Sequence, residues 1–121
     1  MSGQHELGKQ GEDTAEEFLR NKGYEIVQRH YRHGHGEIDI VAKDGDMLVF
    51  VEVKTRASDA YGSPIEAITA GKQRQLYNLA QAYLYERKLT DVPCRIDVIG
   101  IQFMGGRHEI QHIENAMTFM L

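Results

Sequence analysis

The chain has 121 residues, of which 41% are hydrophobic and 26% are charged, and its formal net charge is -4. This composition excludes a disordered or fibrous protein, and the length fits one globular domain that spans residues 1–121. The negative charge argues against a protein that coats nucleic acid through bulk positive charge, although a carboxylate cluster that holds a metal would itself add negative charge.

The remaining composition indicates the compartment in which we expect the chain to work. Cys94 is the single cysteine, so no intramolecular disulfide can form and a reducing environment is favoured. Residues 1–12 are polar and lack the apolar centre of a signal peptide. No window approaches the roughly 20 apolar residues of a membrane span. We therefore expect a soluble, cytoplasmic protein with no membrane partner.

Hydrophobic periodicity and turn residues divide the chain into a helix, a hairpin with a flanking strand, a second helix and two further strands. The first helix places Ala15, Phe18 and Leu19 on one side, and the second has an apolar face from Leu76 to Leu84. The order predicts an α/β fold in which helices cover a central sheet. The expected elements are helices over residues 12–22 and 69–88, strands over 24–27, 37–42, 47–54, 95–103 and 108–113, and loops over 29–36 and 57–64.

The hairpin gives the clearest signal, because two strands rich in β-branched residues flank an Asp-Gly turn. We expect Ala42 to face Met47 across this turn. Asp39 and Glu52 then become diagonal neighbours on one face, about 7–8 Å apart at the backbone, and Glu37 lies opposite Glu52. A shift of one residue would move one carboxylate to the other face. The register of the hairpin is therefore a test of the predicted site.

Asp39 and Glu52 together favour a bound divalent cation, because two carboxylates on neighbouring strands repel each other and are costly to desolvate. Ligands that are all oxygen suit Mg²⁺ or Mn²⁺ rather than zinc. Lys54 follows Glu52 by two residues and shares its face, so it can contact a phosphate or help deprotonate a metal-bound water. This chemistry activates water and stabilises a phosphodiester under attack.

Other polar residues have both a functional and a structural interpretation. Glu12 projects toward the covered side of its helix and can complete the site, or it is an acid favoured by the helix dipole. Gln73 lies on the buried side of its helix, where an amide needs a partner, and is expected to contact water or substrate near Lys54. Lys72 is expected to face solvent. Glu37 is either a further acid near the metal or a solvated strand residue.

The basic, histidine-rich stretch of residues 29–36 suits contacts with a nucleic-acid backbone, or it is a solvated turn. Its histidines have no cysteine partner and no repeated spacing, which argues against a structural zinc site. The residues expected to contact nucleic acid are Arg32, Arg56 and Lys72.

Asp39 followed by Glu52-Val53-Lys54 on the next strand resembles the PD-(D/E)XK nuclease superfamily. More closely, the chain resembles the bacterial YraN family over nearly its whole length. This resemblance implies a restriction-endonuclease-like fold, an α/β/α sandwich with a central mixed sheet, similar to that of archaeal Holliday-junction resolvases. The segments that carry the family resemblance, in order, are residues 8–12, 36–42, 49–56, 62–64, 72–73, 95–98 and 112–116.

The resemblance also implies roles for individual residues. Glu12, Asp39 and Glu52 are expected to hold the metal, with the carbonyl of Val53 as a further ligand, and Lys54 to act on the nucleophilic water.

Two features concern the match itself. Either Lys72 or Gln73 matches a polar residue that some of these nucleases carry on the following helix. The chain departs from the usual patterns at Ile38, which replaces the leading proline of the superfamily, and at His30, where YraN-like sequences are expected to have asparagine.

Together these observations predict a nuclease that hydrolyses DNA with Mg²⁺ or Mn²⁺. The alternative is a non-catalytic nucleic-acid-binding or assembly module that retains the nuclease fold, since fold does not imply function. Symmetric cuts on two strands would suit a homodimer, which no sequence feature establishes.

Overall fold

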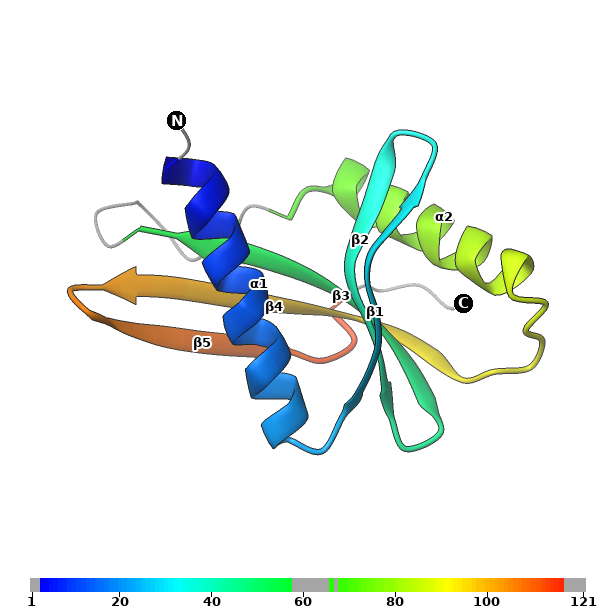
Figure 1. Ribbon diagram of the computed structural model, residues 1–121. Coiled ribbons are helices and arrows are strands. Elements are labelled where there is room, and N and C mark those ends of the chain that lie inside the picture. The colour runs from blue at the N-terminus through cyan, green and yellow to red at the C-terminus, as the bar shows by residue number, and fades with distance from the viewer. Residues whose placement is uncertain (1–2, 58–65, 67, 117–121) are drawn as a thin grey trace.

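The computed structural model describes residues 3–57, 66 and 68–116, with side chains from residue 6 onward. No helix among these residues is long and apolar enough to cross a membrane. Figure 1 shows two helices and five strands, which in chain order are α1 (Gly3–Asn21), β1 (Glu25–His33), β2 (Gly36–Asp44), β3 (Met47–Arg56), α2 (Ala70–Glu86), β4 (Cys94–Met104) and β5 (Arg107–Ile113).

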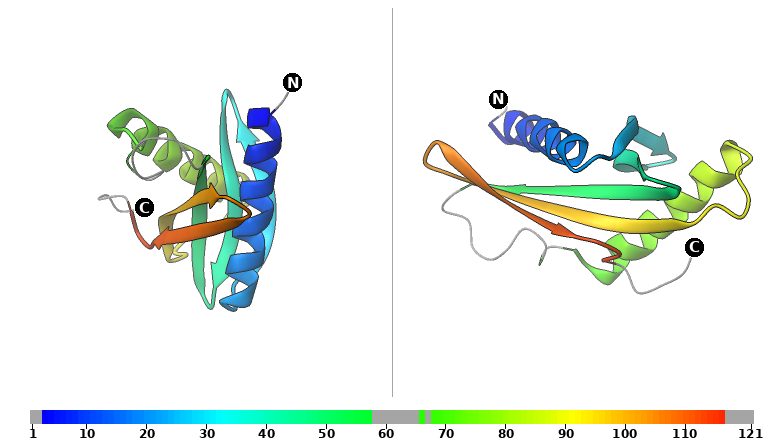
Figure 2. Two further views of the ribbon diagram at one scale, coloured as in Figure 1. Left: turned by 90° about the vertical axis from the view of Figure 1, so that its left-hand side faces the viewer. Right: turned by 90° about the horizontal axis from the view of Figure 1, so that it is seen from below.

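The five strands form one mixed sheet in the order β1-β2-β3-β4-β5. β3 and β4 run parallel, whereas the other neighbouring pairs are antiparallel. A parallel pair needs a crossover connection, and α2 lies within it. The two helices pack on opposite faces of the sheet (Figure 2). The structure therefore confirms the predicted α/β fold, with a central mixed sheet between helices.

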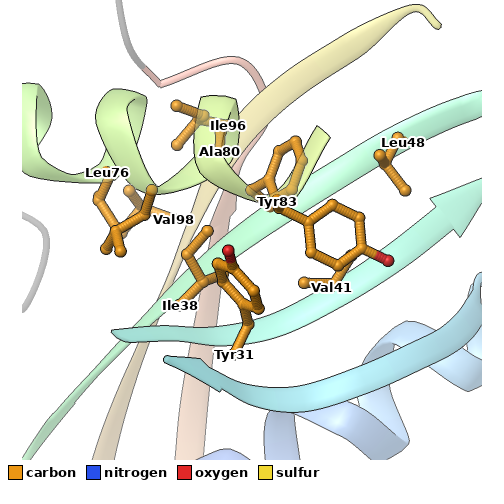
Figure 3. Packing of buried hydrophobic residues seen from close by; sticks show 11 residues of the cluster. Tyr31, Ile38, Val41, Leu48, Leu76, Ala80, Tyr83, Ile96 and Val98 are labelled. Atoms are coloured by element: carbon orange, nitrogen blue, oxygen red, sulfur yellow. The ribbon is translucent and has the colours of Figure 1, made fainter. Parts of the chain in front are cut away.

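Alternating side chains give the central strands two apolar faces, so each helix covers its own core. Beneath α2, the ring of Tyr31 lies edge-on to that of Tyr83, with centroids 5.2 Å apart (Figure 3). The ring of Phe50 is also edge-on to Tyr83, with centroids 5.5 Å apart. The residues predicted for the apolar face of α2 are buried there, with Leu84 partly buried. The α2-side core comprises Tyr31, Ile38, Val41, Leu48, Phe50, Leu76, Leu79, Ala80, Tyr83, Ile96 and Val98, and the α1-side core comprises Ala15, Leu19, Tyr24, Ile40, Ala42, Val49, Val51, Ile99 and Ile101.

Some element boundaries differ from the sequence prediction. α1 begins at Gly3 rather than at residue 12. Residues 29–33, predicted as part of a loop, continue β1, because this polar edge strand pairs with β2 as far as His33 opposite Gly36. A strand at the edge of a sheet tolerates charged residues that interior strands do not. Apart from residue 57, the predicted loop of residues 57–64 lies outside the described residues.

Asp97 is a structural acid within an apolar strand. It is fully buried on β4, and one of its oxygens accepts hydrogen bonds from the side chain of Arg95 at 2.9 Å and from the backbone N–H of Asn115 at 2.9 Å. Its other oxygen lies 2.8 Å from Nε2 of His112. Burial opposes the charge on Asp97, but the hydrogen bonds outweigh it and lower its pKa. This carboxylate therefore joins β4 to the end of the described chain.

Substitution of a core ring tests the packing beneath α2. Phe50 is 1% exposed, so Phe50→Ala should lower the free energy of unfolding by about 3–5 kcal/mol, because it leaves a cavity under Tyr83. Val27, which is 41% exposed, provides the control, and Val27→Ala should change stability by about 0.5 kcal/mol or less. Urea denaturation measures both variants, and equal losses would contradict this core.

Candidate active site

The site begins where β2 and β3 part. These strands pair from Asp44 opposite Met47 to Ile40 opposite Val51, and no pairing between them continues beyond Ile40 among the described residues. β2 then turns away from β3 (Figure 1). Asp39 is the next residue of β2, and its Oδ2 accepts a hydrogen bond of 2.7 Å from the backbone N–H of Val53. The carboxylate thus replaces the backbone partner that Val53 would have had in a continuous ladder.

This register corrects the predicted one. The hairpin turns within two residues, so Val41 rather than Asp39 lies opposite Phe50, and Asp39 and Glu52 are the next residues along the two strands rather than diagonal partners. The prediction placed Ala42 opposite Met47, which needs a four-residue turn. A two-residue turn shifts the register by an even number of residues, so the faces of the strands are preserved even though the partners change.

Glu37 does not lie opposite Glu52, in contrast to the prediction. It pairs instead with Arg32 on β1, and its carboxylate accepts a hydrogen bond from Nε of Arg32 at 3.1 Å and lies 2.6 Å from Nδ1 of His30. The shorter turn and the parting of the strands direct Glu37 toward β1.

The direction of Asp39 depends on an irregularity shared by β1 and β2. Ile38 packs in the α2-side core, but Ile40 packs in the α1-side core, although residues two apart in a regular strand share a face. On β1, His30 has a positive φ of 58°, between Arg29 opposite Ile40 and Tyr31 opposite Ile38. Non-glycine residues rarely adopt this conformation, and such strain is concentrated at functional sites.

Glu52 supplies the second carboxylate from β3. Its side chain is 5% exposed, and Oε2 lies 3.5 Å from Nζ of both Lys54 and Lys72. Oε1 is buried and has no hydrogen-bond partner among the described residues. A buried charged oxygen that lacks a partner is costly, so this atom is suited to receive a cation or a hydrogen-bond donor that arrives with a ligand.

Asp39 experiences a strongly negative environment. Burial raises its pKa to about 8, and the charges of Glu52, Glu12 and Glu37 act in the same direction against the opposing hydrogen bond from Val53. The structure therefore gathers carboxylates that resist simultaneous ionisation. Such perturbed groups mark candidate functional sites.

Glu12 reaches this region because α1 lies close to β3. A Cβ built on Gly11 would lie 2.0 Å from Oγ1 of Thr55, so glycine permits the close approach. The carboxylate of Glu12 lies 3.1 Å from Nη2 of Arg29 and 2.9 Å from Nε2 of His30. Glu12 therefore interacts electrostatically with Asp39 but is directed to β1 by an ion pair with Arg29 and a polar contact with His30. Sequence analysis did not assign Arg29 and His30 to the site.

The structure corrects the predicted orientation of Lys72. Its side chain is 28% exposed and reaches Glu52 from α2 instead of facing open solvent. Helical spacing contained the signal, because Lys72 lies one turn before the buried Leu76. Gln73 is partly buried, and its side chain makes no hydrogen bond to another described residue. The predicted catalytic role of Gln73 stays a prediction.

The other predicted residues are separate from the pair of carboxylates. Arg32 is 74% exposed and pairs with Glu37, and Arg56 is partly buried at the end of β3. Among the described residues, no three side chains of histidine, cysteine, aspartate or glutamate form a group that could hold a metal ion. Asp39 and Glu52 thus form the centre of the site, and Glu12 stands at its margin.

The fold and the site define a class: a small α/β protein with two carboxylates and two lysines where β2 and β3 part. We call this place, formed by Asp39, Glu52, Lys54 and Lys72, the strand fork. The model of the uncharacterised protein family UPF0102 matches residues 11–101, which include every one of these side chains. A UPF0102 protein of Chlorobium phaeobacteroides is 48% identical over 118 residues, with 93% of this chain and 94% of the relative covered. One of Symbiobacterium thermophilum is 48% identical over 111 residues, with 91% and 94% covered. The chain belongs to family UPF0102.

The environment of Asp39 predicts how the metal-free protein responds to pH. The pKa of an aspartate in an unfolded chain is about 3.9, whereas that of Asp39 is raised to about 8. Between these values the folded state binds the additional proton, so its free energy of unfolding should fall, on the order of a few kcal/mol, as the pH rises from about 4 to 8. Asp39→Asn keeps an acceptor for Val53 and should remove this decline.

Urea denaturation in EDTA across this pH range measures the effect. Asp13→Asn is the control, because hydrogen bonds from Arg29 and Lys9 lower the pKa of Asp13 and its titration falls below this range. If the free energy of unfolding of Asp39→Asn falls as steeply with pH as that of the unsubstituted protein, the raised pKa does not belong to Asp39.

Proposed function

We propose that this protein is a nuclease of the PD-(D/E)XK superfamily that hydrolyses phosphodiester bonds of DNA with the aid of Mg²⁺ or Mn²⁺. The observation that carries the proposal is the buried, unpartnered Oε1 of Glu52 beside Asp39 at the strand fork, with Lys54 on the same strand. Family membership agrees with this proposal but supplies no functional name of its own.

The side chains at the fork fit a divalent cation. Oε1 of Glu52 lacks a hydrogen-bond partner among the described residues. Burial first and then the charge of Glu52 raise the pKa of Asp39, and a cation would relieve the second of these causes. Oxygen ligands of this kind favour Mg²⁺ or Mn²⁺. Asp39, Glu52 and the carbonyl of Val53 would hold the ion, with Glu12 completing the set. A bound ion would supply the positive charge that activates water and stabilises the phosphate under attack.

The side chains of the protein provide the remaining parts of the mechanism. Lys54 is 33% exposed, so its Nζ can contact both Glu52 and a phosphate oxygen or a water from solvent. Lys72 approaches Glu52 from α2, and the two lysines together offset the buried carboxylate. The N–H of Val53 fixes the orientation of Asp39, which limits the reorganisation needed when substrate binds.

A second candidate function is a DNA-binding or assembly module without catalysis. The observation that favours it is the engagement of Glu12 by Arg29 and His30, which satisfies this acid without a metal. The two functions differ in metal affinity and in turnover, so both can be measured.

Cation binding should stabilise the protein. Millimolar Mn²⁺ should raise the Tm of the unsubstituted chain, because a ligand that binds only the folded state stabilises it by mass action. Glu52→Gln, which removes one charge from the fork, should abolish most of the shift. Glu109→Gln removes an exposed charge from β5 and should retain the shift. Differential scanning fluorimetry gives the comparison, and an equal shift in all three proteins would contradict a metal site at the fork.

Cleavage tests the enzyme directly. Labelled duplex, single-stranded, flap and four-way-junction DNA would be incubated with Mg²⁺, Mn²⁺ or EDTA. We expect metal-dependent products from the unsubstituted protein and from Glu109→Gln, and a loss of about 100-fold or more in Glu52→Gln and Lys54→Met, because each removes a group placed for the reaction. Absence of cleavage on every substrate, with DNA binding retained, would favour the second function.

A further inference from the structure

An open cavity lies between α2 and the turn that joins β1 to β2. Its volume is about 470 Å³, which is within the range of roughly 300–1,000 Å³ typical of small-molecule sites. Gly36 lets the hairpin approach α2, since a Cβ there would lie 2.9 Å from Cδ1 of Leu79. Leu79 is buried and contributes an apolar wall.

Among the described residues, the lining of this cavity is rich in hydrogen-bonding side chains and contains no carboxylate, and the ring of His33 contacts the carboxylate of Glu86 at 3.1 Å. His33 and His35 contribute flat rings from the hairpin, and Arg74, Gln75 and Asn78 contribute a guanidinium and two amides from α2. In a chain with a net charge of -4, described lining residues that include Arg74 and no acid favour an anionic ligand on the α2 side of the cavity.

Several of these side chains are available to a ligand. Arg74, Asn78 and His35 are exposed, and within the part of the chain that the structure describes none of them forms a hydrogen bond or an ion pair. Free side chains of this kind can bind without first breaking an internal contact. The rings and amides suit the base of a nucleotide, and the guanidinium of Arg74 suits its phosphate.

We propose that this cavity binds an unpaired nucleotide of a DNA strand. A base within a duplex is stacked and paired, so it can enter a side-chain cavity only after leaving the stack. Unpaired bases are free to insert between rings and amides, and stacking of this kind tolerates different sequences. The inference rests on the proposed function and narrows its substrate to DNA with single-stranded nucleotides beside the scissile bond.

The residues that line the cavity are close in sequence to those of the candidate active site. Gly71 and Arg74 line the cavity on α2, and Lys72, which contacts Glu52, lies between them in sequence. Across the cavity, Gly36 precedes Asp39 on the same strand. A nucleotide strand that leaves the cavity along either of these elements would run toward the carboxylates of the fork.

Fluorescence anisotropy in EDTA tests the cavity without catalysis. The probes are a labelled single strand, the same strand with abasic sites, and the duplex of the same sequence. The intact single strand should bind about tenfold more tightly than the other two. Asn78→Phe, which fills the cavity, and Arg74→Ala should each weaken single-strand binding about tenfold and leave duplex binding unchanged. Arg107→Ala, which removes the same charge from exposed β5, should bind as the unsubstituted protein does.

Circular dichroism of each variant confirms that it folds. Equal binding of single strand and duplex, or unchanged single-strand binding by Asn78→Phe, would overturn the inference. This failure is distinguishable from failure of the proposed function. Cleavage in Mg²⁺ that Asn78→Phe does not affect would support the nuclease and contradict the nucleotide-binding cavity. Single-strand binding that depends on Asn78, without cleavage, would support the cavity and contradict the nuclease.

Discussion

The hydrogen bond from the N–H of Val53 to Asp39 is the interaction on which the site depends. A buried backbone N–H needs an acceptor, and the departure of β2 from β3 takes away the one that a continuous ladder would supply. Because a carboxylate replaces it, the strands can separate without leaving this donor unpaired. The same replacement holds Asp39 next to Glu52 and opens the space between the hairpin and α2.

Negative charge at the fork is offset from both faces of the sheet. On the α2 side, Lys54 and Lys72 contact Glu52. On the α1 side, Arg29 contacts Glu12, Asp13 and Glu16 of the first helix, and the last two of these acids are more exposed than Glu12. The partners of Glu12 come from a strand whose backbone is irregular at His30. The conformation of β1 therefore determines how these acids are arranged.

The sequence predicted those features that follow from a repeating pattern. Helical spacing identified the buried face of α2, and β-branched runs identified the strands of the hairpin, so the fold class and the neighbouring positions of Asp39 and Glu52 could be expected. The partner of Glu37 could not, because a turn of two or four residues preserves the faces while it changes every partner. The link between Glu12 and His30 also lay beyond prediction, because it depends on how α1 crosses β1.

Two buried carboxylates of one sheet show how structural and functional acids differ. Asp97 is fully buried, and both of its oxygens have partners, among them Arg95, His112 and the backbone of Asn115. Glu52 is buried to nearly the same degree, yet one of its oxygens has no partner among the described residues. Evolution toward stability alone would favour a partner for that atom or an apolar replacement for the side chain, since an unsatisfied charge lowers stability. The cost borne at Glu52 is therefore the strongest physical reason to assign chemistry to this part of the fold.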